Sequence, residues 1–368
     1  METPKERLVY VDNLRLFVIA CVVMHHLAVT YSGFGGFYYF ETRPMGLAST
    51  LWFGLYLSFQ QAYFMGLLFL IAGYFTAGSG EKRGLGSFAL ERARRLLLPA
   101  LAYMALIVPF IELVLLRRKW QGFSLGGFLS SSGVMWFTIA LFVFSLVYAL
   151  ARLARRGRAA GTWRLEPTPA TASALISIIA AGAFLVRLVQ PIGTSVLNMQ
   201  LGYFSSYIVL FSAGILARRG GLFASLSPRS GKRWLLAGLV LSPLLWIVLA
   251  VSAEASGRRE AIFGGPGWLS AAYSTWEAFT AVAMSLGLIS LFRERFDRQG
   301  PLVRALSDNA FTVYMFHPPI LTAVCLLLQP LELPSFAKWL LLCAICLPLC
   351  FALAAFVIRR IPLLQKIL

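Results

Sequence analysis

Long apolar segments recur along the chain and are separated by short polar loops. A helix that crosses the hydrocarbon core needs about 20 mostly apolar residues. Ten segments fit, at about 11–31, 56–78, 96–116, 133–151, 170–190, 199–217, 234–253, 269–292, 310–329 and 337–358. These segments are too long and too continuous for barrel strands. The pattern predicts an all-α membrane protein, a polytopic bundle of about ten transmembrane helices in a single domain spanning residues 1–368.

Composition supports an integral, multi-pass membrane protein. The chain is 59% hydrophobic, whereas soluble domains are about 45–50% apolar. The net charge of +18 is concentrated in loops between apolar segments, which argues against a nucleic-acid partner and for contact with a lipid bilayer. All five cysteines lie in apolar segments, where thiols are poor nucleophiles and poor metal ligands unless ionised.

The basic residues also predict an orientation. With the N-terminus inside and the helices alternating, 24 of the 33 Lys and Arg residues fall on the cytoplasmic side and seven on the other. This bias is typical of cytoplasmic loops. We therefore expect both termini to be cytoplasmic and the protein to lie in the cell (inner) membrane. The cluster at 117–119 is a local exception.

The first apolar segment contains ionisable residues, which cost about 2.5–3.5 kcal/mol each at the centre of a membrane helix. At about 100° per residue, Arg15 and His26 lie within about 20° of one face, with Asp12 close to it. His25 lies about 80° away and should face a neighbouring helix. One face thus presents an acid–base pair near the cytoplasmic end and an imidazole about 16 Å further along. The alternative is an interfacial Asp12–Arg15 pair with a structural His26.

Other polar groups are also predicted to lie within the membrane. Arg187 and Glu277 are expected to be embedded and to pair across the bundle, and His317 is embedded in the ninth segment. Glu112, near the end of the third segment, is expected to pair with a basic residue at 117–118.

Several motifs together resemble the acyltransferase-3 family of integral-membrane acyltransferases. The Asp12-Asn13-Leu14-Arg15 sequence, followed by ten residues and then His26, is similar to the family's first-helix signature. Further similarity lies at 61–75, in the basic loop with Lys82 and Arg83 and the R-x-x-R pair Arg92 and Arg95, at Trp136-Phe137, at 187–193 and 207–214, and in the Y-x-x-H-P sequence of Tyr314 to Pro318. The chain departs from the family at Val134-Met135, where a polar residue is common, and at Phe311. No hydrolase-like C-terminal domain of the kind some members carry is expected.

The resemblance implies transfer of an acyl group, most often acetyl, from acetyl-CoA or another acyl-CoA to a hydroxyl of a glycan or other exported or small-molecule acceptor. An imidazole suits the general base, so His26 is assigned as base, with Asp12 and Arg15 shaping the local field. Lys82, Arg83, Arg92 and Arg95 are expected to bind the phosphates of the donor, although cytoplasmic topology alone also explains their charge. The residues expected to contact the substrate or line its cavity are Tyr314, His317, Arg187, Glu277 and Trp136.

Two other classes of function are alternatives. A proton-coupled transporter would also use embedded Arg, Glu and His side chains, but no inverted repeat is visible and the ordered motifs favour the enzyme. A haem or metal protein is disfavoured because the chain has only three histidines, two of them adjacent.

Overall fold

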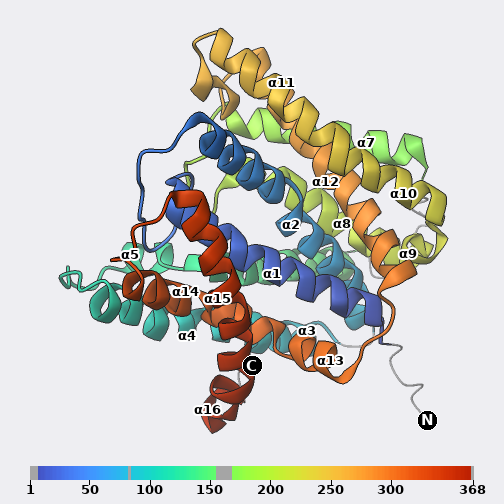
Figure 1. The fold of residues 1–368 in the computed structure, drawn as a ribbon. Helices are drawn as coiled ribbons and strands as arrows, with labels where there is room; N and C mark the ends of the chain where they lie inside the picture. The colour runs from blue at the N-terminus through green and yellow to red at the C-terminus, as the bar shows by residue number, and fades with distance from the viewer. Residues whose placement is uncertain (1–6, 82–83, 155–167, 366–368) are drawn as a thin grey trace.

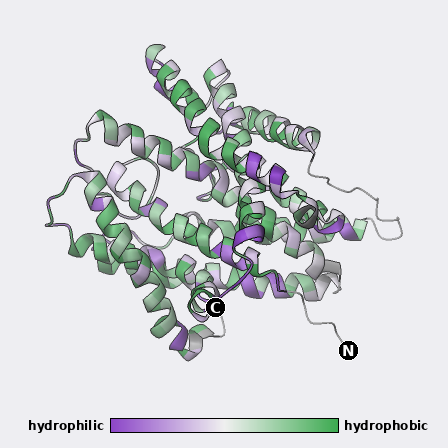
Figure 2. Cartoon of the chain, turned by 45° about the vertical axis from the view of Figure 1, so that its right-hand side comes forward, coloured by the Kyte–Doolittle hydropathy of each residue, from purple (hydrophilic) through white to green (hydrophobic). Residues whose placement is uncertain are grey.

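A computed structural model describes residues 7–81, 84–154 and 168–365. These residues form a helical bundle without β-strands (Figure 1). Ten described segments are long and apolar enough to cross a membrane, and each overlaps a predicted span: Val9–Ser32, Leu47–Ser79, Gly86–Leu115, Gly133–Ala154, Pro169–Arg187, Leu201–Gly220, Pro228–Ala255, Trp268–Arg295, Ala310–Leu327 and Ser335–Arg360. Hydrophobic residues cover most of the length of these helices (Figure 2). The predicted fold class is confirmed.

Eight spans are built on one long helix each. These helices are α1 (Val9–Ser32), α2 (Leu47–Glu81), α6 (Trp136–Ala154), α7 (Pro169–Arg187), α8 (Phe204–Gly220), α12 (Trp268–Arg295), α14 (Ala310–Leu327) and α15 (Ser335–Phe356).

Two spans contain wider π-helical turns. The third consists of α3 (Leu85–Arg92), η1 (Ala93–Leu97), α4 (Leu98–Ala102), η2 (Tyr103–Ile107) and η3 (Phe110–Leu115), and the seventh of α10 (Pro228–Leu236), η6 (Ala237–Leu241) and α11 (Ser242–Ala255). Short connecting helices are α5 (Leu125–Ser130), η4 (Gly133–Met135), η5 (Leu201–Tyr203), α9 (Leu222–Ser225), η7 (Arg259–Ile262), α13 (Pro301–Asp308), η8 (Ile358–Arg360) and α16 (Pro362–Gln365).

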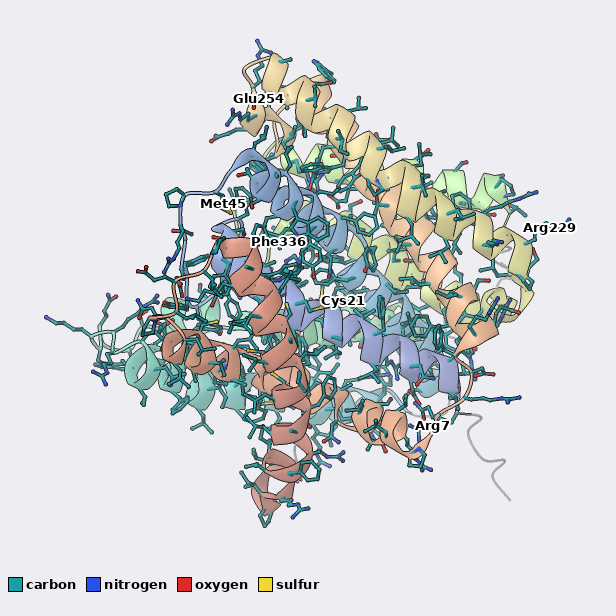
Figure 3. The ribbon with its side chains drawn as sticks, in the orientation of Figure 1. Arg7, Cys21, Met45, Arg229, Glu254 and Phe336 are labelled. Atoms are coloured by element: carbon teal, nitrogen blue, oxygen red, sulfur yellow. The ribbon has the colours of Figure 1, made fainter. Side chains whose placement is uncertain are left out.

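The two ends of the described chain lie at the same end of the bundle. Arg7 Nη2 is 3.1 Å from Asp308 Oδ1, and Arg359 Nη1 donates to the Asp308 carbonyl at 3.0 Å. We call this the terminal end. Figure 3 shows Arg7 and Arg229 there, Met45 and Phe336 toward the opposite, loop end, and Cys21 of α1 between them. Which end faces the cytoplasm stays a prediction from the charge bias.

At the centre of the bundle, α2 and α8 cross so closely that no side chain fits between their backbones. A Cβ atom at Gly73 of α2 would overlap the carbonyl oxygen of Phe211 of α8, and one at Gly214 of α8 would overlap that of Leu70 of α2. Small residues allow such approach between membrane helices, where packing replaces the hydrophobic effect as the driving force. The most buried of the ten spans is α12, which packs against α1, α2, α7 and α10.

Helix α1 belongs to two different apolar clusters. Leu14 and Val18 pack in a cluster with residues of α2, α6, α7, α8 and α12. Val23 and Leu27, nearer the loop end, pack in a second cluster with residues of α14 and α15. Groups at the two ends of α1 therefore face different neighbouring helices.

Candidate functional site

The carboxylate of Asp12 lies between two guanidinium groups at the terminal end of α1. Arg15 Nη1 is 3.3 Å from Asp12 Oδ1, and Arg7 Nε is 2.7 Å from Asp12 Oδ2. The Cζ atom of Arg15 lies 4.6 Å from the centroid of the Phe75 ring on α2, a cation–π contact. Asp12 and Arg15, which share a face of α1, are thus in contact with each other, and Arg15 packs against α2.

Asn13 anchors the start of α1 to the segment that follows α12. Its Nδ2 donates to the carbonyls of Phe296 at 2.6 Å and Arg298 at 3.1 Å, and its Oδ1 accepts from Gln299 Nε2 at 2.9 Å. Sequence reasoning did not assign Asn13 a role, although a second polar residue beside Asp12 in an apolar helix was a signal that it had a partner. The anchor sets the position of Asp12 and Arg15.

His26 lies in a stack of three rings from three parts of the chain. Its imidazole centroid is 5.2 Å from that of His317 on α14, with the planes 23° apart, and 4.6 Å from the ring of Phe37, with the planes 20° apart. His25 points elsewhere, with its ring 4.9 Å from Phe64 of α2. The adjacent histidines therefore have different surroundings, as their angular separation on α1 predicts.

The hydrogen bonds of His317 identify its protonated nitrogen. Nδ1 is 2.8 Å from the carbonyl oxygen of Tyr314 and 3.2 Å from that of Val313. A carbonyl oxygen only accepts, so Nδ1 carries the proton and neutral His317 has its lone pair on Nε2. His317 is fully buried. Within the part of the chain that the structure describes, neither His317 Nε2 nor His26 Nδ1 has a hydrogen-bond partner.

The loop 33–46 between α1 and α2 carries Phe37 onto His26, and we call it the cover loop. Lys338 of α15, which is fully buried, donates to Glu41 Oε1 at 2.5 Å, and the Glu41 N–H donates to the carbonyl of Thr30 at 2.9 Å. These contacts tie the loop to α15 and α1. The sequence pattern gave no signal that Phe37 contacts His26.

A second set of contacts anchors the cover loop to the third span. The hydroxyl groups of Tyr38 and Tyr103 are 3.0 Å apart, and burial raises the pKa of Tyr38 to about 12, so this hydroxyl stays protonated. Arg118 Nη2 donates to the Tyr38 carbonyl at 3.3 Å, while Arg118 Nη1 is 2.6 Å from Glu112 Oε2. Glu112 thus has the neighbouring basic partner that was predicted for it.

Tyr314 and Trp136 occupy different positions relative to the ring stack. Tyr314 is one turn before His317 on α14, and its hydroxyl donates to the Val134 carbonyl. Val134 is one of the positions where the sequence departs from the family pattern, and its backbone carbonyl therefore accepts a hydrogen bond. Trp136 packs into an aromatic cluster, with its ring 5.6 Å from Tyr207 of α8 and 6.4 Å from Phe69 of α2. Trp136 thus belongs to the packing between α6, α8 and α2.

Arg187 and Glu277 form a buried ion pair between α7 and α12. Arg187 Nη2 donates to Glu277 Oε2, Nη1 donates to Ser274 Oγ at 2.9 Å, and Nε donates to the Gly202 carbonyl at 3.1 Å. Side-chain exposure is 0% for Arg187 and 2% for Glu277. The predicted pairing across the bundle is present. All three guanidinium nitrogens are engaged, which makes this pair a tie between α7, η5 and α12.

The R-x-x-R pair lies where α3 passes into η1 at the terminal end. Arg92 Cζ is 5.1 Å from the ring centroid of Phe88, and Arg95 Nη2 is 3.2 Å from Glu91 Oε1, with the Arg95 side chain 73% exposed. Lys82 and Arg83 lie outside the described residues. Arg92 and Arg95 are therefore at the same end of the bundle as Arg15, and Arg95 is accessible to an anion.

Two chemically distinct regions result. Guanidinium groups gather at the terminal end. Toward the loop end, under the cover loop, lie two imidazoles, each with a ring nitrogen that has no partner among the described residues. About 16 Å separates Arg15 from His26 along α1. The first region is able to bind anionic groups, and the second is able to accept a proton.

Comparison with known proteins adds one match. Residues 8–355 match the family described as an acyltransferase domain, which is the acyltransferase-3 family that the motifs resemble. No curated protein and no solved structure matches the chain.

Proposed function

The chain belongs to the acyltransferase-3 family and is a membrane acyltransferase, and from this premise we propose that it transfers an acyl group, acetyl in the first instance, from acyl-CoA to a hydroxyl of an acceptor, with His26 as general base. The observation on which the proposal rests is the stack of His26 on His317 beneath Phe37. Few groups other than an imidazole can accept a proton near neutral pH, and both rings present a buried nitrogen without a partner among the described residues.

The chemical step is attack of a hydroxyl oxygen on the thioester carbonyl. His26 takes the hydroxyl proton as the new C–O bond forms, the C–S bond breaks, and the proton passes to the departing thiolate to give the free thiol of coenzyme A. General base catalysis of this kind contributes about 10²–10⁴-fold to the rate. The Phe37 ring supports this role because it stacks on the half-buried His26 imidazole and shields that face of the base from bulk water.

The terminal end is the proposed site of the donor's phosphates. Arg95 is accessible, and Arg92 and Arg15 lie at the same end. Guanidinium groups bind phosphate through paired hydrogen bonds. The charge bias predicts that this end faces the cytoplasm, where acyl-CoA is found. The membrane would then be the cell (inner) membrane. The pantetheine arm would then extend along α1 from Arg15 toward His26.

The acceptor is proposed to be a glycan or another polyhydroxylated molecule that reaches His26 from the loop end. An aromatic ring such as Phe37 suits a sugar, because the apolar face of the sugar packs on the ring while its hydroxyl groups remain available. Entry of the acceptor would require Phe37 to move from its stacked position on His26.

The test is acyl transfer by purified protein with radiolabelled acetyl-CoA and a panel of hydroxyl acceptors. His26→Gln should reduce transfer by about 10²-fold or more, whereas His25→Gln, which alters an adjacent imidazole packed on Phe64, should retain most activity. Transfer at the wild-type rate in His26→Gln would exclude this base. Substrate flux into proteoliposomes without coenzyme A, and without acyl transfer, would indicate a carrier instead.

A further inference from the structure

Two consecutive prolines alter the backbone hydrogen bonds of α14 just beyond His317. Pro318 and Pro319 are both buried inside the helix. In an α-helix, the N–H of residue i bonds to the carbonyl of residue i−4, and proline has no N–H. Tyr314 is four residues before Pro318, and Met315 is four residues before Pro319. The carbonyls of Tyr314 and Met315 therefore lack their usual helical donors.

The carbonyl that Pro318 leaves without its amide donor is the one that His317 uses. His317 Nδ1 donates to the Tyr314 carbonyl at 2.8 Å, which is shorter than its 3.2 Å contact with the Val313 carbonyl. The Val313 carbonyl is also the usual helical acceptor for the backbone N–H of His317, four residues later. Tyr314 thus provides an acceptor whose usual helical donor is missing, and its bond to the ring keeps the proton on Nδ1.

The other ring nitrogen, Nε2, belongs to the imidazole that stacks on His26. His317 is fully buried, Nε2 has no partner among the described residues, and the ring stacks on His26 at 5.2 Å. Buried polar atoms in proteins almost always have a hydrogen-bond partner. With the proton on Nδ1, Nε2 needs a donor, and a hydroxyl is such a donor.

We infer that Pro318 is a positioning residue that locks His317 in the Nδ1–H tautomer, so that Nε2 accepts a hydrogen bond from a polyhydroxylated acceptor at His26. This inference rests on the proposed function for the identity of the hydroxyl donor. One hydroxyl of the acceptor is deprotonated at His26, and a second bonds to His317 Nε2. The two imidazoles together thus select an acceptor with more than one hydroxyl group.

The tautomer is measurable without any enzymatic assay. The chain has three histidines, so ¹⁵N-histidine labelling gives three imidazoles, assigned with the variants His25→Gln and His26→Gln. We expect the wild-type protein to show His317 protonated on Nδ1. Pro318→Ala restores an N–H for the Tyr314 carbonyl and should populate the Nε2–H tautomer. Pro319→Ala is the matched control, since it restores an N–H for Met315 only and should leave the tautomer unchanged.

Kinetics test the link to the acceptor. Pro318→Ala should raise the KM for a polyol acceptor about tenfold, the effect of one hydrogen bond, and raise it less for a monohydric alcohol. Pro319→Ala should change neither. A wild-type His317 protonated on Nε2, or a tautomer unaffected by Pro318→Ala, would overturn the inference even if a variant folds poorly. A wild-type protein with the Nδ1–H tautomer but no acyl transfer would contradict the proposed function and still support the lock.

Discussion

The imidazoles of His26 and His317 stack with their centroids 5.2 Å apart, although they come from the first and the ninth spans. A lone histidine in a membrane helix is readily satisfied by a backbone carbonyl. Here that description fits His317 Nδ1 only, while His317 Nε2 and His26 Nδ1 have no partner among the described residues. The stack therefore concentrates proton-accepting capacity at one position between α1 and α14.

Removing the ring that covers His26 should change the fate of the acyl group. In Phe37→Ala, water reaches the imidazole that Phe37 covers at 4.6 Å, and exclusion of water is what protects a reactive acyl donor from hydrolysis. We expect acyl-CoA hydrolysis without acceptor to rise several-fold and transfer to fall, as measured by release of the free thiol. Phe34→Ala alters an exposed ring of the same loop and should leave both rates near wild type. Equal hydrolysis in the two variants would show that Phe37 is not the cover.

Lys338 should determine whether the cover loop stays closed. Lys338→Met leaves the Glu41 carboxylate largely buried without its 2.5 Å partner, and breaking a buried ion pair costs about 3–5 kcal/mol. The loop 33–46 should then exchange its amide hydrogens faster and be cleaved more readily in limited proteolysis. Arg43→Met is the control, because Arg43 is 36% exposed and 3.8 Å from the same carboxylate, where a pair contributes less than about 1 kcal/mol. Similar protection in both variants would contradict the prediction.

The Arg187–Glu277 pair should affect stability through its geometry as well as its charge. Arg187→Met leaves Glu277 charged and buried, so we expect a loss of about 3–5 kcal/mol. The double variant Arg187→Met/Glu277→Leu should lose less, as measured by unfolding in detergent. The swapped variant Arg187→Glu/Glu277→Arg should not recover wild-type stability, because the new carboxylate would face the Gly202 carbonyl that Arg187 Nε now bonds. Full recovery by the swap would mean that charge alone matters.

Loss of Arg95, a member of the R-x-x-R pair, should weaken coenzyme A binding more than loss of Arg94, which lies between the two arginines of the pair. Arg95→Gln should weaken coenzyme A binding about tenfold, the equivalent of about 1.4 kcal/mol, if its accessible guanidinium contacts a phosphate. Arg94→Gln removes the same charge one residue away and should have a smaller effect. Isothermal titration with coenzyme A compares the two directly. Equal weakening would point to general attraction between charges, which salt would screen.

Sequence patterns predicted the spans and the local pairs well for physical reasons. A bilayer imposes the length of each span, so all ten were recognisable from apolar content alone. Helical spacing places Asp12 beside Arg15. Arg187 and Glu277 are costly when unpaired in the membrane, which made their pairing foreseeable, although the Ser274 and Gly202 contacts were not.

The parts of the site that depend on distant segments were not foreseeable. Asp12, Arg15 and His26 share a face of α1, yet Arg15 contacts Phe75 of α2 whereas His26 contacts His317 of α14. Different helices contact the two ends of α1, and periodicity carries no information about which helix packs against which end. Phe37 was one aromatic residue among several in its loop, and its place on His26 is a tertiary contact without a local signal.

The crossing of α2 and α8 limits how the bundle can move. At Gly73 and Gly214 the two backbones touch with no side chain between them, so there is neither space to slide nor a soft layer to compress. An added methyl group at either position would force the helices apart. We therefore expect this contact to resist sliding of α2 against α8. Larger conformational changes are accordingly expected in elements away from this crossing.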